Sequence, residues 1–155
     1  AGSKLRKAQS LGVTVLDDCY NANPGSMDAG LGVAKEMADQ AGGLAIAVLG
    51  DMLELGAEAD RLHREVGLRA AKLGISGLIG FGVLSSHTVD GGGGVDWVGY
   101  RPGTGLDDVD AVVGMLRDQI GKGDVVLIKG SRGMRMERIV TALCSDDDMQ
   151  SRESH

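Results

Sequence analysis

The chain has 155 residues, about the length of one domain, which is enough to bury a sizeable core. Its formal net charge of −6 argues against a nucleic-acid-binding surface, because such a surface would be basic. No apolar run approaches the roughly 18 residues of a membrane span, and residues 1–10 are too polar for a signal peptide, so we expect a cytoplasmic protein with no membrane span.

Strand and helix patterns alternate along the chain. Val13 begins the first clear apolar run, and Ser26 is the residue expected to cap the helix that follows. Gly42 and Gly43 end that helix, and Gly74 ends the next. In chain order we expect a strand at 13–16, a helix at 26–41, a strand at 44–49, a loop at 50–56, a helix at 57–73, a strand at 78–81, a loop at 90–94, a strand at 95–98, a helix at 106–120, a strand at 125–128 and a helix at 134–143.

This alternation predicts a single-domain α/β, Rossmann-like fold. The expected sheet is open and mostly parallel, with right-handed crossovers and helices on both faces. The run at 44–49 is apolar throughout, as a parallel strand covered on both faces should be. We expect the domain to span residues 1–145 and an acidic, polar tail at 146–155 to be disordered.

The first segment that suggests chemistry is 17–26, which reads D-D-C-Y-N-A-N-P-G-S. It puts two carboxylates, two amides and a helix start at the carboxyl end of a strand, where open α/β sheets bind ligands. From the residues alone, Asp17 and Asp18 could instead cap backbone amides at the helix entry. Because adjacent side chains of a strand point to different sides, the two acids should have different roles. Asn21 and Asn23 could likewise only shape a turn.

The second segment, 49–56, reads L-G-D-M-L-E-L-G and follows a core strand, so it should share the sheet edge with the first. Asp51 and Glu54 could meet an ammonium group, since a buried cation needs an anionic partner. The alternative is an ordinary glycine-rich connection. His63 follows on the next helix, where a single histidine is more often a surface or core-edge residue than a catalyst.

The third segment, 129–137, reads K-G-S-R-G-M-R-M-E. A serine at a helix N-terminus, Ser131, between Lys129 and Arg132 would make an anion site from backbone amides, a hydroxyl and two cations. The alternative is that Ser131 only caps the helix while the cations are solvated, and the residues alone favour that alternative.

Several motifs are missing from the sequence. It contains no G-x-x-x-x-G-K-[ST] phosphate loop, and no G-x-G-x-x-G follows a strand at the required spacing. No metal-ligand cluster and no Ser/His/Asp triad is supported. Cys19 and Cys144 lie far apart without metal-site spacing, so we expect both to be reduced thiols.

These segments closely resemble the C-terminal domain of the Mur ligases, the ATP-dependent ligases of peptidoglycan synthesis. The resemblance covers about residues 6–143. It rests on three strings, D-D-x-Y-N-A-N-P-x-S-M, L-G-D-M-x-E-L-G and K-G-S-R-x-x-x-M-E, and the H-x-x-V-G spacing at 63–67 is also that of the family. Mur ligases also have an N-terminal domain for the UDP-sugar and a central ATPase domain with the phosphate loop, and neither is in this sequence.

The resemblance implies a reaction for the full-length protein. ATP and Mg²⁺, both bound mainly by the central domain, would activate the peptide carboxylate of UDP-N-acetylmuramoyl-tripeptide as an acyl phosphate. The amine of D-alanyl-D-alanine would then attack it. This domain would hold the dipeptide and close over the nucleotide, with no catalytic residue of its own. We therefore expect the chain alone to be inactive, and the protein to be a monomer.

The resemblance also implies roles for single residues. Asp18 corresponds to the acid that hydrogen-bonds the ATP ribose, while Asn21 and Asn23 line the junction between the nucleotide and the incoming amino acid. An arginine in the position of Arg6 contacts the nucleotide at the hinge to the central domain.

The loop at 129–137 faces the amino-acid substrate in the family, which makes Lys129, Ser131 and Arg132 candidates for binding the dipeptide carboxylate. Asp51 and Glu54 are the candidates for its ammonium group. His63 would have a structural or supporting role at the same site.

Two other interpretations stay open. The chain could belong to a sister Mur ligase that adds a single amino acid, although the loops of those enzymes read differently. It could also be a nucleotide-binding or regulatory module without chemistry, or a scaffold for a protein partner. Activity of the full-length protein with several amino acids and dipeptides would distinguish these functions.

Overall fold

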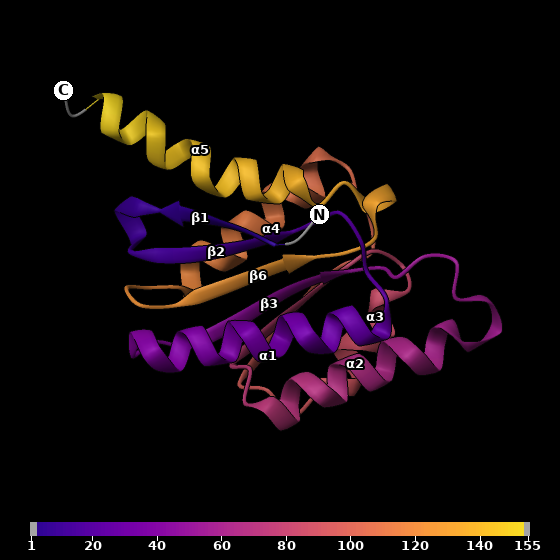
Figure 1. Cartoon of the computed structure of the whole chain (residues 1–155). Coiled ribbons are helices and arrows are strands. Elements are labelled where there is room, and N and C mark those ends of the chain that lie inside the picture. Colours follow the sequence, from indigo (N-terminus) through magenta and orange to yellow (C-terminus); the bar gives the residue numbers. More distant parts are fainter. Residues whose placement is uncertain (1–2, 154–155) are drawn as a thin grey trace.

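The computed structural model describes residues 3–153, and describes side chains for residues 3–145. Figure 1 shows one sheet between layers of helices. The strands are β1 (Lys4–Ala8), β2 (Val13–Asp18), β3 (Ala45–Gly50), β4 (Gly77–Phe81), β5 (Trp97–Arg101) and β6 (Val125–Lys129). The α-helices are α1 (Pro24–Ala41), α2 (Ala59–Leu73), α3 (Ser85–Gly91), α4 (Leu106–Gln119) and α5 (Glu137–Glu153). Short 3₁₀ turns lie at Gln9–Leu11, Gly56–Glu58 and Arg132–Met134.

The strands form a sheet in the order β1-β2-β6-β3-β4-β5. The edge strand β1 is antiparallel to β2, and the other neighbouring pairs are parallel. The carboxyl ends of β2, β6, β3, β4 and β5 therefore lie along one edge. This confirms the predicted α/β fold with an open, mostly parallel sheet. Strand β1 was not predicted, because the first strand expected from the sequence started at residue 13.

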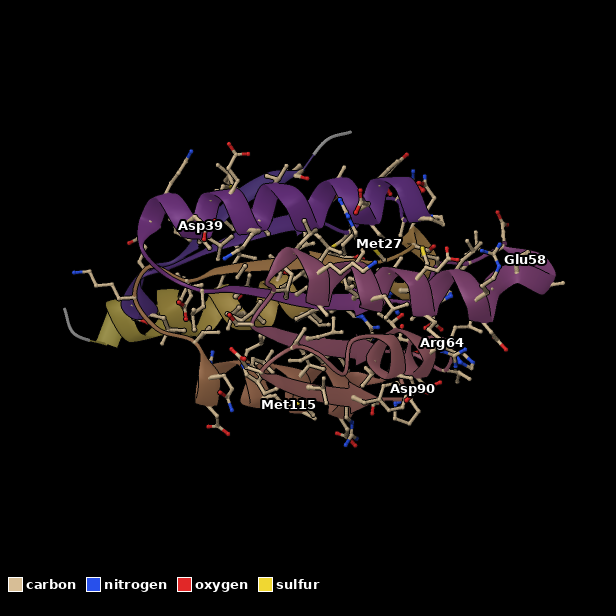
Figure 2. The ribbon with its side chains drawn as sticks, turned by 90° about the horizontal axis from the view of Figure 1, so that it is seen from below. Met27, Asp39, Glu58, Arg64, Asp90 and Met115 are labelled. Carbon is tan, nitrogen blue, oxygen red and sulfur yellow. The ribbon has the colours of Figure 1, made fainter. Side chains whose placement is uncertain are left out.

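Hydrophobic cores lie on both faces of the sheet, as the fold class requires. Helices α1 and α2 cover one face and α4 and α5 the other (Figure 1). Successive residues of β3 alternate between the two, so that Val48 packs beneath α4 and α5 while Leu49 packs beneath α1 and α2. Figure 2 shows side chains filling the space between these layers, including the buried Met27 of α1.

The first helix begins earlier than predicted because a different residue caps it. Asn23, not Ser26, is the N-cap of α1, and its Oδ1 accepts the backbone N–H of Ser26 at 2.9 Å. Ser26 Oγ accepts the N–H of Asn23 at 3.0 Å in return, which completes a capping box. Pro24 then stands at the first helical position, where its missing N–H costs nothing.

Helix α3 was not predicted, because we expected a loop at 90–94 and no helix before it. With only 7 residues it has no apolar stripe long enough to detect. The first turn of α3 is stabilised by a residue outside the helix, since Oδ1 of Asp51 accepts the backbone N–H of Ser85 at 2.8 Å. Packing against α2 is close enough that a side chain at Gly67 would collide with the carbonyl of Thr88.

Several other boundaries also differ from the prediction, most clearly those of β5 and the last helix. Strand β5 is Trp97–Arg101 instead of 95–98. The last helix starts at Glu137 instead of 134, because Arg135 has a left-handed backbone with φ +53° between the 3₁₀ turn and α5. The backbone of α5 is helical to Glu153, past residue 145 where we expected the ordered domain to end. The disorder expected for the tail at 146–155 stays a prediction, and residues 154–155 lie outside the described part of the chain.

Candidate functional site

The three segments singled out in the sequence lie side by side at the carboxyl edge of the sheet. Strands β2, β6 and β3 are direct neighbours, so the loops that follow them at 19–23, 130–136 and 51–55 are adjacent. The register places Asp18 beside Lys129, and Lys129 beside Leu49. The expectation that these segments share one sheet edge is therefore confirmed.

Asp18 and Lys129 form a buried ion pair between two of these segments. Lys129 Nζ donates to Asp18 Oδ2 at 2.8 Å and to the backbone oxygen of Asn21 at 2.8 Å. Ser3 Oγ donates to the same Asp18 oxygen at 3.1 Å. The side chain of Lys129 is 2% exposed and that of Asp18 is 15% exposed. At this depth each charge has lost most of its hydration, so burying either one without the other would carry a large desolvation cost.

A cavity of about 260 Å³ opens beside this ion pair. It is lined by Ser3, Leu16, Asp18, Asn21, Ser26, Ala29, Gly30, Val33 and Lys129. Its polar lining consists of carboxylate, amide, ammonium and hydroxyl groups, and its apolar lining comes from Leu16 of β2 and from Ala29, Gly30 and Val33 of α1. Typical ligand pockets measure roughly 300–1,000 Å³, so this cavity suits one polar part of a larger ligand. The carboxylate of Asp18 could accept hydrogen bonds from neighbouring hydroxyls there.

Asn23 and Asn21 have separate roles in the loop after β2. The Asn23 side chain caps α1, which confirms the local backbone role that the residues alone allowed. Asn21 is exposed and lines the cavity, and its backbone oxygen accepts from Lys129. The structure thus brings Asn21, rather than the side chain of Asn23, together with Asp18.

In the loop after β3, the Asp51 side chain is tied to α3. It is 6% exposed, and its Oδ1 accepts from the backbone N–H of Ser85 at 2.8 Å and from Ser85 Oγ at 2.7 Å. Gly82 adopts φ +117°, and a Cβ there would lie 2.5 Å from the Asp51 carboxylate. Glu54 is exposed at the tip of the loop, with an unusual positive φ of 65°.

His63 fastens this loop to α2. Its ring is fully buried, and Nε2 accepts the backbone N–H of Met52 at 2.9 Å. Its Nδ1 lies 2.6 Å from the backbone oxygen of Ala59. These partners assign the ring proton to Nδ1, because Nε2 must be free to accept. His63 thus has a structural role, in which its ring joins the backbone of the loop after β3 to the first turn of α2.

The loop after β6 is bonded to the loop after β3. The Ser131 N–H donates to the backbone oxygen of Asp51 at 3.1 Å, and Ser131 Oγ accepts the N–H of Leu53 at 2.8 Å. Ser131 is the N-cap residue of the three-residue 3₁₀ turn, but its side chain makes no cap bond, so the alternative in which Ser131 only caps a helix is wrong. The guanidinium of Arg132 is exposed and lies 5.1 Å from the ring centre of Tyr20.

Arg6 does not line the cavity beside Asp18. It lies on β1 opposite Val15, and directly paired residues point to the same face of a sheet. Val15 packs in the core beneath α4 and α5. Asp18, three residues further along β2, points to the other face, where α1 lies. An interaction of Arg6 with the same ligand group as Asp18 thus finds no support in this arrangement.

The sequence did not reveal Ser3, Ser85 and Tyr20 as partners of the site. Ser3 reaches Asp18 because β1 is paired with β2, and Ser85 reaches Asp51 because β4 lies beside β3. Both contacts depend on strand pairing. Only a prediction of β1 as a strand would have signalled the first of them.

Cys19 is buried under the same edge. Its Sγ donates to the backbone oxygen of Ile128 at 3.5 Å. Burial raises the pKa of the Cys19 thiol far above its ordinary value, and the hydrogen bond with Asp17 raises it further. This thiol is therefore protonated, and a nucleophilic role would need the opposite shift.

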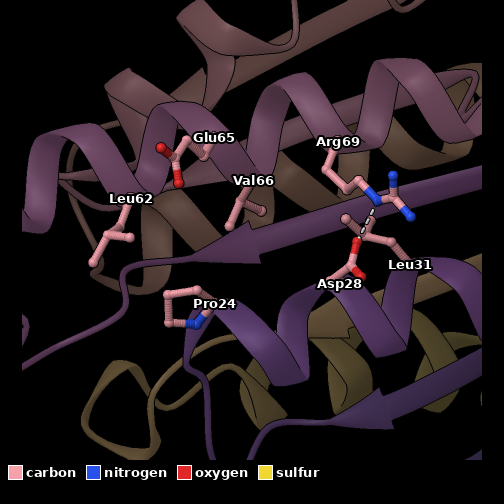
Figure 3. A pocket seen from close by; sticks show the side chains of 7 residues that line it. All are labelled: Pro24, Asp28, Leu31, Leu62, Glu65, Val66 and Arg69. Atoms are coloured by element: carbon pink, nitrogen blue, oxygen red, sulfur yellow. Dashed lines mark hydrogen bonds and ion pairs between the residues drawn. The ribbon is translucent and has the colours of Figure 1, made fainter.

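A second cavity of about 260 Å³ lies between α1 and α2, shown in Figure 3. Pro24 and Leu31 of α1 face Val66 of α2 in this cavity, and Arg69 Nε donates to Asp28 Oδ1 at 2.6 Å between the two helices. None of the candidate residues lines this cavity.

Among residues with described side chains, no group of three or more His, Cys, Asp or Glu residues could hold a metal ion. The described helices include none that is both long and apolar enough to cross a bilayer.

Comparison with known proteins assigns the chain to a family. A family model described as Mur ligase, glutamate ligase domain, matches residues 5–132. The chain belongs to the Mur ligase family. The matched range includes all three loops at the carboxyl edge up to Arg132 and ends before α5.

Two curated relatives of this Mur ligase domain are named UDP-N-acetylmuramoyl-tripeptide--D-alanyl-D-alanine ligase. The one from Mycobacterium tuberculosis is 37% identical over 150 residues, which cover 88% of this chain and 29% of that protein. The one from Escherichia coli is 39% identical over 131 residues, which cover 83% of this chain and 26% of that protein. The chain thus spans less than a third of the length of these relatives.

Solved structures give the same picture. The MurF ligase from Thermotoga maritima in complex with ADP matches with a TM-score of 0.76 and 26% identity, covering 95% of this chain and 31% of that one. A MurF structure from Acinetobacter baumannii matches with a TM-score of 0.73 and 25% identity, covering 92% and 30%. The fold predicted from the sequence is the fold of these ligase domains.

Proposed function

We propose that this chain is the C-terminal domain of an ATP-dependent, ADP-forming ligase that joins D-alanyl-D-alanine to UDP-N-acetylmuramoyl-tripeptide in peptidoglycan synthesis. The observation that carries the proposal is the 37–39% identity to two ligases with that name. The matching strings at 17–26, 49–56 and 129–137 all lie at one sheet edge. We place the full-length protein in the cytoplasm, as a monomer.

In this proposal the nucleotide binds at the cavity beside Asp18. The polar lining of the cavity fits a ribose, because a carboxylate accepts from two vicinal hydroxyls and Asn21 adds an amide. The apolar flank of Leu16, Ala29 and Val33 suits the less polar surface of a nucleoside. A neighbour of the same fold was solved with ADP. Because this cavity holds only part of a ligand, the phosphates and Mg²⁺ would be bound mainly by a central domain.

The dipeptide would bind beside the nucleotide, at the loops after β3 and β6. Arg132 supplies an exposed cation for the dipeptide carboxylate, next to Ser131. Glu54 supplies an exposed anion for its ammonium group. Asp51 is the less accessible of the two acids, since Ser85 already donates to its carboxylate twice.

The contribution of this domain to the reaction is positioning. ATP, when bound, supplies the phosphoryl group that activates the tripeptide carboxylate. The residues of this chain would hold the amine of the dipeptide at that carboxylate and exclude water as the domain closes. The two hydrogen bonds between Ser131 and residues 51 and 53 make the two dipeptide loops one unit. A unit of this kind can approach the other domains without losing its shape.

The test is a substrate panel with the full-length enzyme. ATP, UDP-N-acetylmuramoyl-tripeptide and one acceptor at a time are supplied, and ADP and ligated product are measured. We expect product with D-alanyl-D-alanine and background levels with single amino acids. Ligation of a single amino acid in preference to the dipeptide would refute the proposal and point to a sister Mur ligase.

A further inference from the structure

Lys129 occupies a position that its sequence neighbours do not suggest. It is the last residue of β6, beside Ser131 and Arg132 in the chain, yet its side chain is only 2% exposed. Its Nζ lies 2.8 Å from Asp18 Oδ2 and 2.8 Å from the backbone oxygen of Asn21. Two of the three ammonium donors are thus directed at the loop after β2, not at the loops proposed to bind the dipeptide.

The contacts of Asp18 show what this lysine does. Lys129 and Ser3 both donate to Oδ2 of the carboxylate, at 2.8 and 3.1 Å. A carboxylate has lone pairs on both oxygens, so Asp18 keeps acceptor capacity at Oδ1 while Oδ2 is anchored. Without Lys129, a carboxylate that is 15% exposed would face the desolvation cost of its charge with one neutral hydroxyl as partner.

We propose that Lys129 is a positioning residue for the nucleotide, which holds the Asp18 carboxylate and the Asn21 backbone at the wall of the cavity. Lys129 lines the same cavity, but its ammonium group is directed at Asp18 and at the backbone oxygen of Asn21, so it acts on the nucleotide through Asp18. This inference rests on the proposed function, because it takes Asp18 as the group that meets the ribose. It replaces the expectation that Lys129 binds the dipeptide carboxylate.

The experiment measures two constants in the full-length enzyme: the Kd for ADP by calorimetry, and the KM for D-alanyl-D-alanine. The variants are Lys129→Met, Lys129→Gln, Asp18→Asn and the double variant Asp18→Asn/Lys129→Met. Lys35→Met is the matched control, because Lys35 also pairs with an aspartate, Asp39 at 2.8 Å, but on the outer surface of α1.

We expect Lys129→Met to weaken ADP binding about 10- to 100-fold, which is the usual range for one charge-assisted hydrogen bond. The KM for the dipeptide should change by less than about twofold. Lys129→Gln keeps a hydrogen-bond donor but loses the charge, so it should weaken ADP binding by a smaller but measurable factor of about three- to tenfold. In the Asp18→Asn background, Lys129→Met should add less than about twofold, because a residue that acts through Asp18 has nothing left to hold. Lys35→Met should alter neither constant.

Three results would overturn the inference. One is an unchanged Kd for ADP with a raised KM for the dipeptide, which would return Lys129 to the dipeptide site. Another is a full, multiplied loss in the double variant, which would mean that Lys129 acts independently of Asp18. The third is an unchanged Kd for ADP in the folded Lys129→Gln variant, which decides the matter if Lys129→Met does not fold. Failure of the wild-type enzyme to ligate D-alanyl-D-alanine would instead refute the proposed function, since ADP binding is measured without ligation.

Discussion

Lys129 is a charged side chain that the fold buries almost completely. The sequence indicated a strand that ends at residue 128, which would have left Lys129 in a loop beside Ser131. The strand continues through Lys129, so its side chain follows Leu127 to the face covered by α1. A difference of one residue at the end of a strand therefore decides whether Lys129 points to Asp18 or toward the loop of Ser131. The ends of strands are the part of a prediction that sequence patterns define least.

Asp51 and His63 show the same limit at single residues. The strings that contain them predicted that both lie at the carboxyl edge of the sheet, and the structure places them there. Their partners, Ser85 and the N–H of Met52, depend on how β4 and α2 pack against β3. No spacing within the motif could reveal contacts of that kind.

Replacing His63 should destabilise the domain, because the buried N–H of Met52 would lose its acceptor. We expect His63→Ala to lower the free energy of unfolding by about 2–4 kcal/mol, through the unsatisfied donor and the cavity left by the ring. His63→Gln is the matched variant, since its amide oxygen can accept the same N–H, and should lose about half as much. Urea denaturation of the purified domain measures both. Equal losses in the two variants would mean that the hydrogen bond is not what stabilises the loop.

Cys19 predicts a dependence of stability on pH. Because burial raises the pKa of its thiol in the folded state, the folded protein keeps this proton while the unfolded chain releases it above about pH 8.5. The contribution of Cys19 to stability is thus fully present below that pH and is lost as the pH rises, by at most about 1.4 kcal/mol per pH unit. Cys19→Ala should flatten the fall in unfolding free energy between pH 8 and pH 10. Parallel curves for the variant and the native chain would contradict this.

At the scale of elements, the accuracy of the sequence prediction followed the length of the apolar pattern. Helix α4 was expected at 106–120 and spans Leu106–Gln119, because it has a sustained stripe that faces the core. Helix α3 has no such stripe and was missed. Its stability comes from Asp51 and from close packing on Gly67, and neither is visible in its own sequence.

Helix α1 should depend on Asn23 more than on any other residue of the loop before it. The side chain of Asn23 satisfies a backbone N–H at the helix start, so Asn23→Ala should cost about 0.5–2 kcal/mol of unfolding free energy. Asn21→Ala is the control, because Asn21 contributes its backbone oxygen, which the substitution leaves in place. The comparison is made by urea denaturation of both variants. A larger loss for Asn21→Ala than for Asn23→Ala would show that the cap is not what holds α1.

At the scale of the whole molecule, the strand order is what makes three separate motifs one site. The alternation of strands and helices predicted the fold class and the shared edge, but it could not predict that β6 inserts between β2 and β3. That insertion places the last motif between the first two. Asp18 can then pair with Lys129, 111 residues later, and Ser131 can bond residues 51 and 53.

We propose that this edge binds the nucleotide at Asp18 and the dipeptide carboxylate at Arg132. The most direct measurement is kcat/KM of the full-length enzyme for D-alanyl-D-alanine and for its carboxyl-amide analogue, in the wild type and in Arg132→Ala. Arg61→Ala is the control, an exposed arginine on α2 whose partners are Glu58 and Glu65. We predict that Arg132→Ala lowers kcat/KM for the acid by about 10- to 100-fold and for the amide by a few-fold at most, since the amide carries no anion. Equal losses for acid and amide would contradict the claim and leave the loop after β6 with a structural role alone.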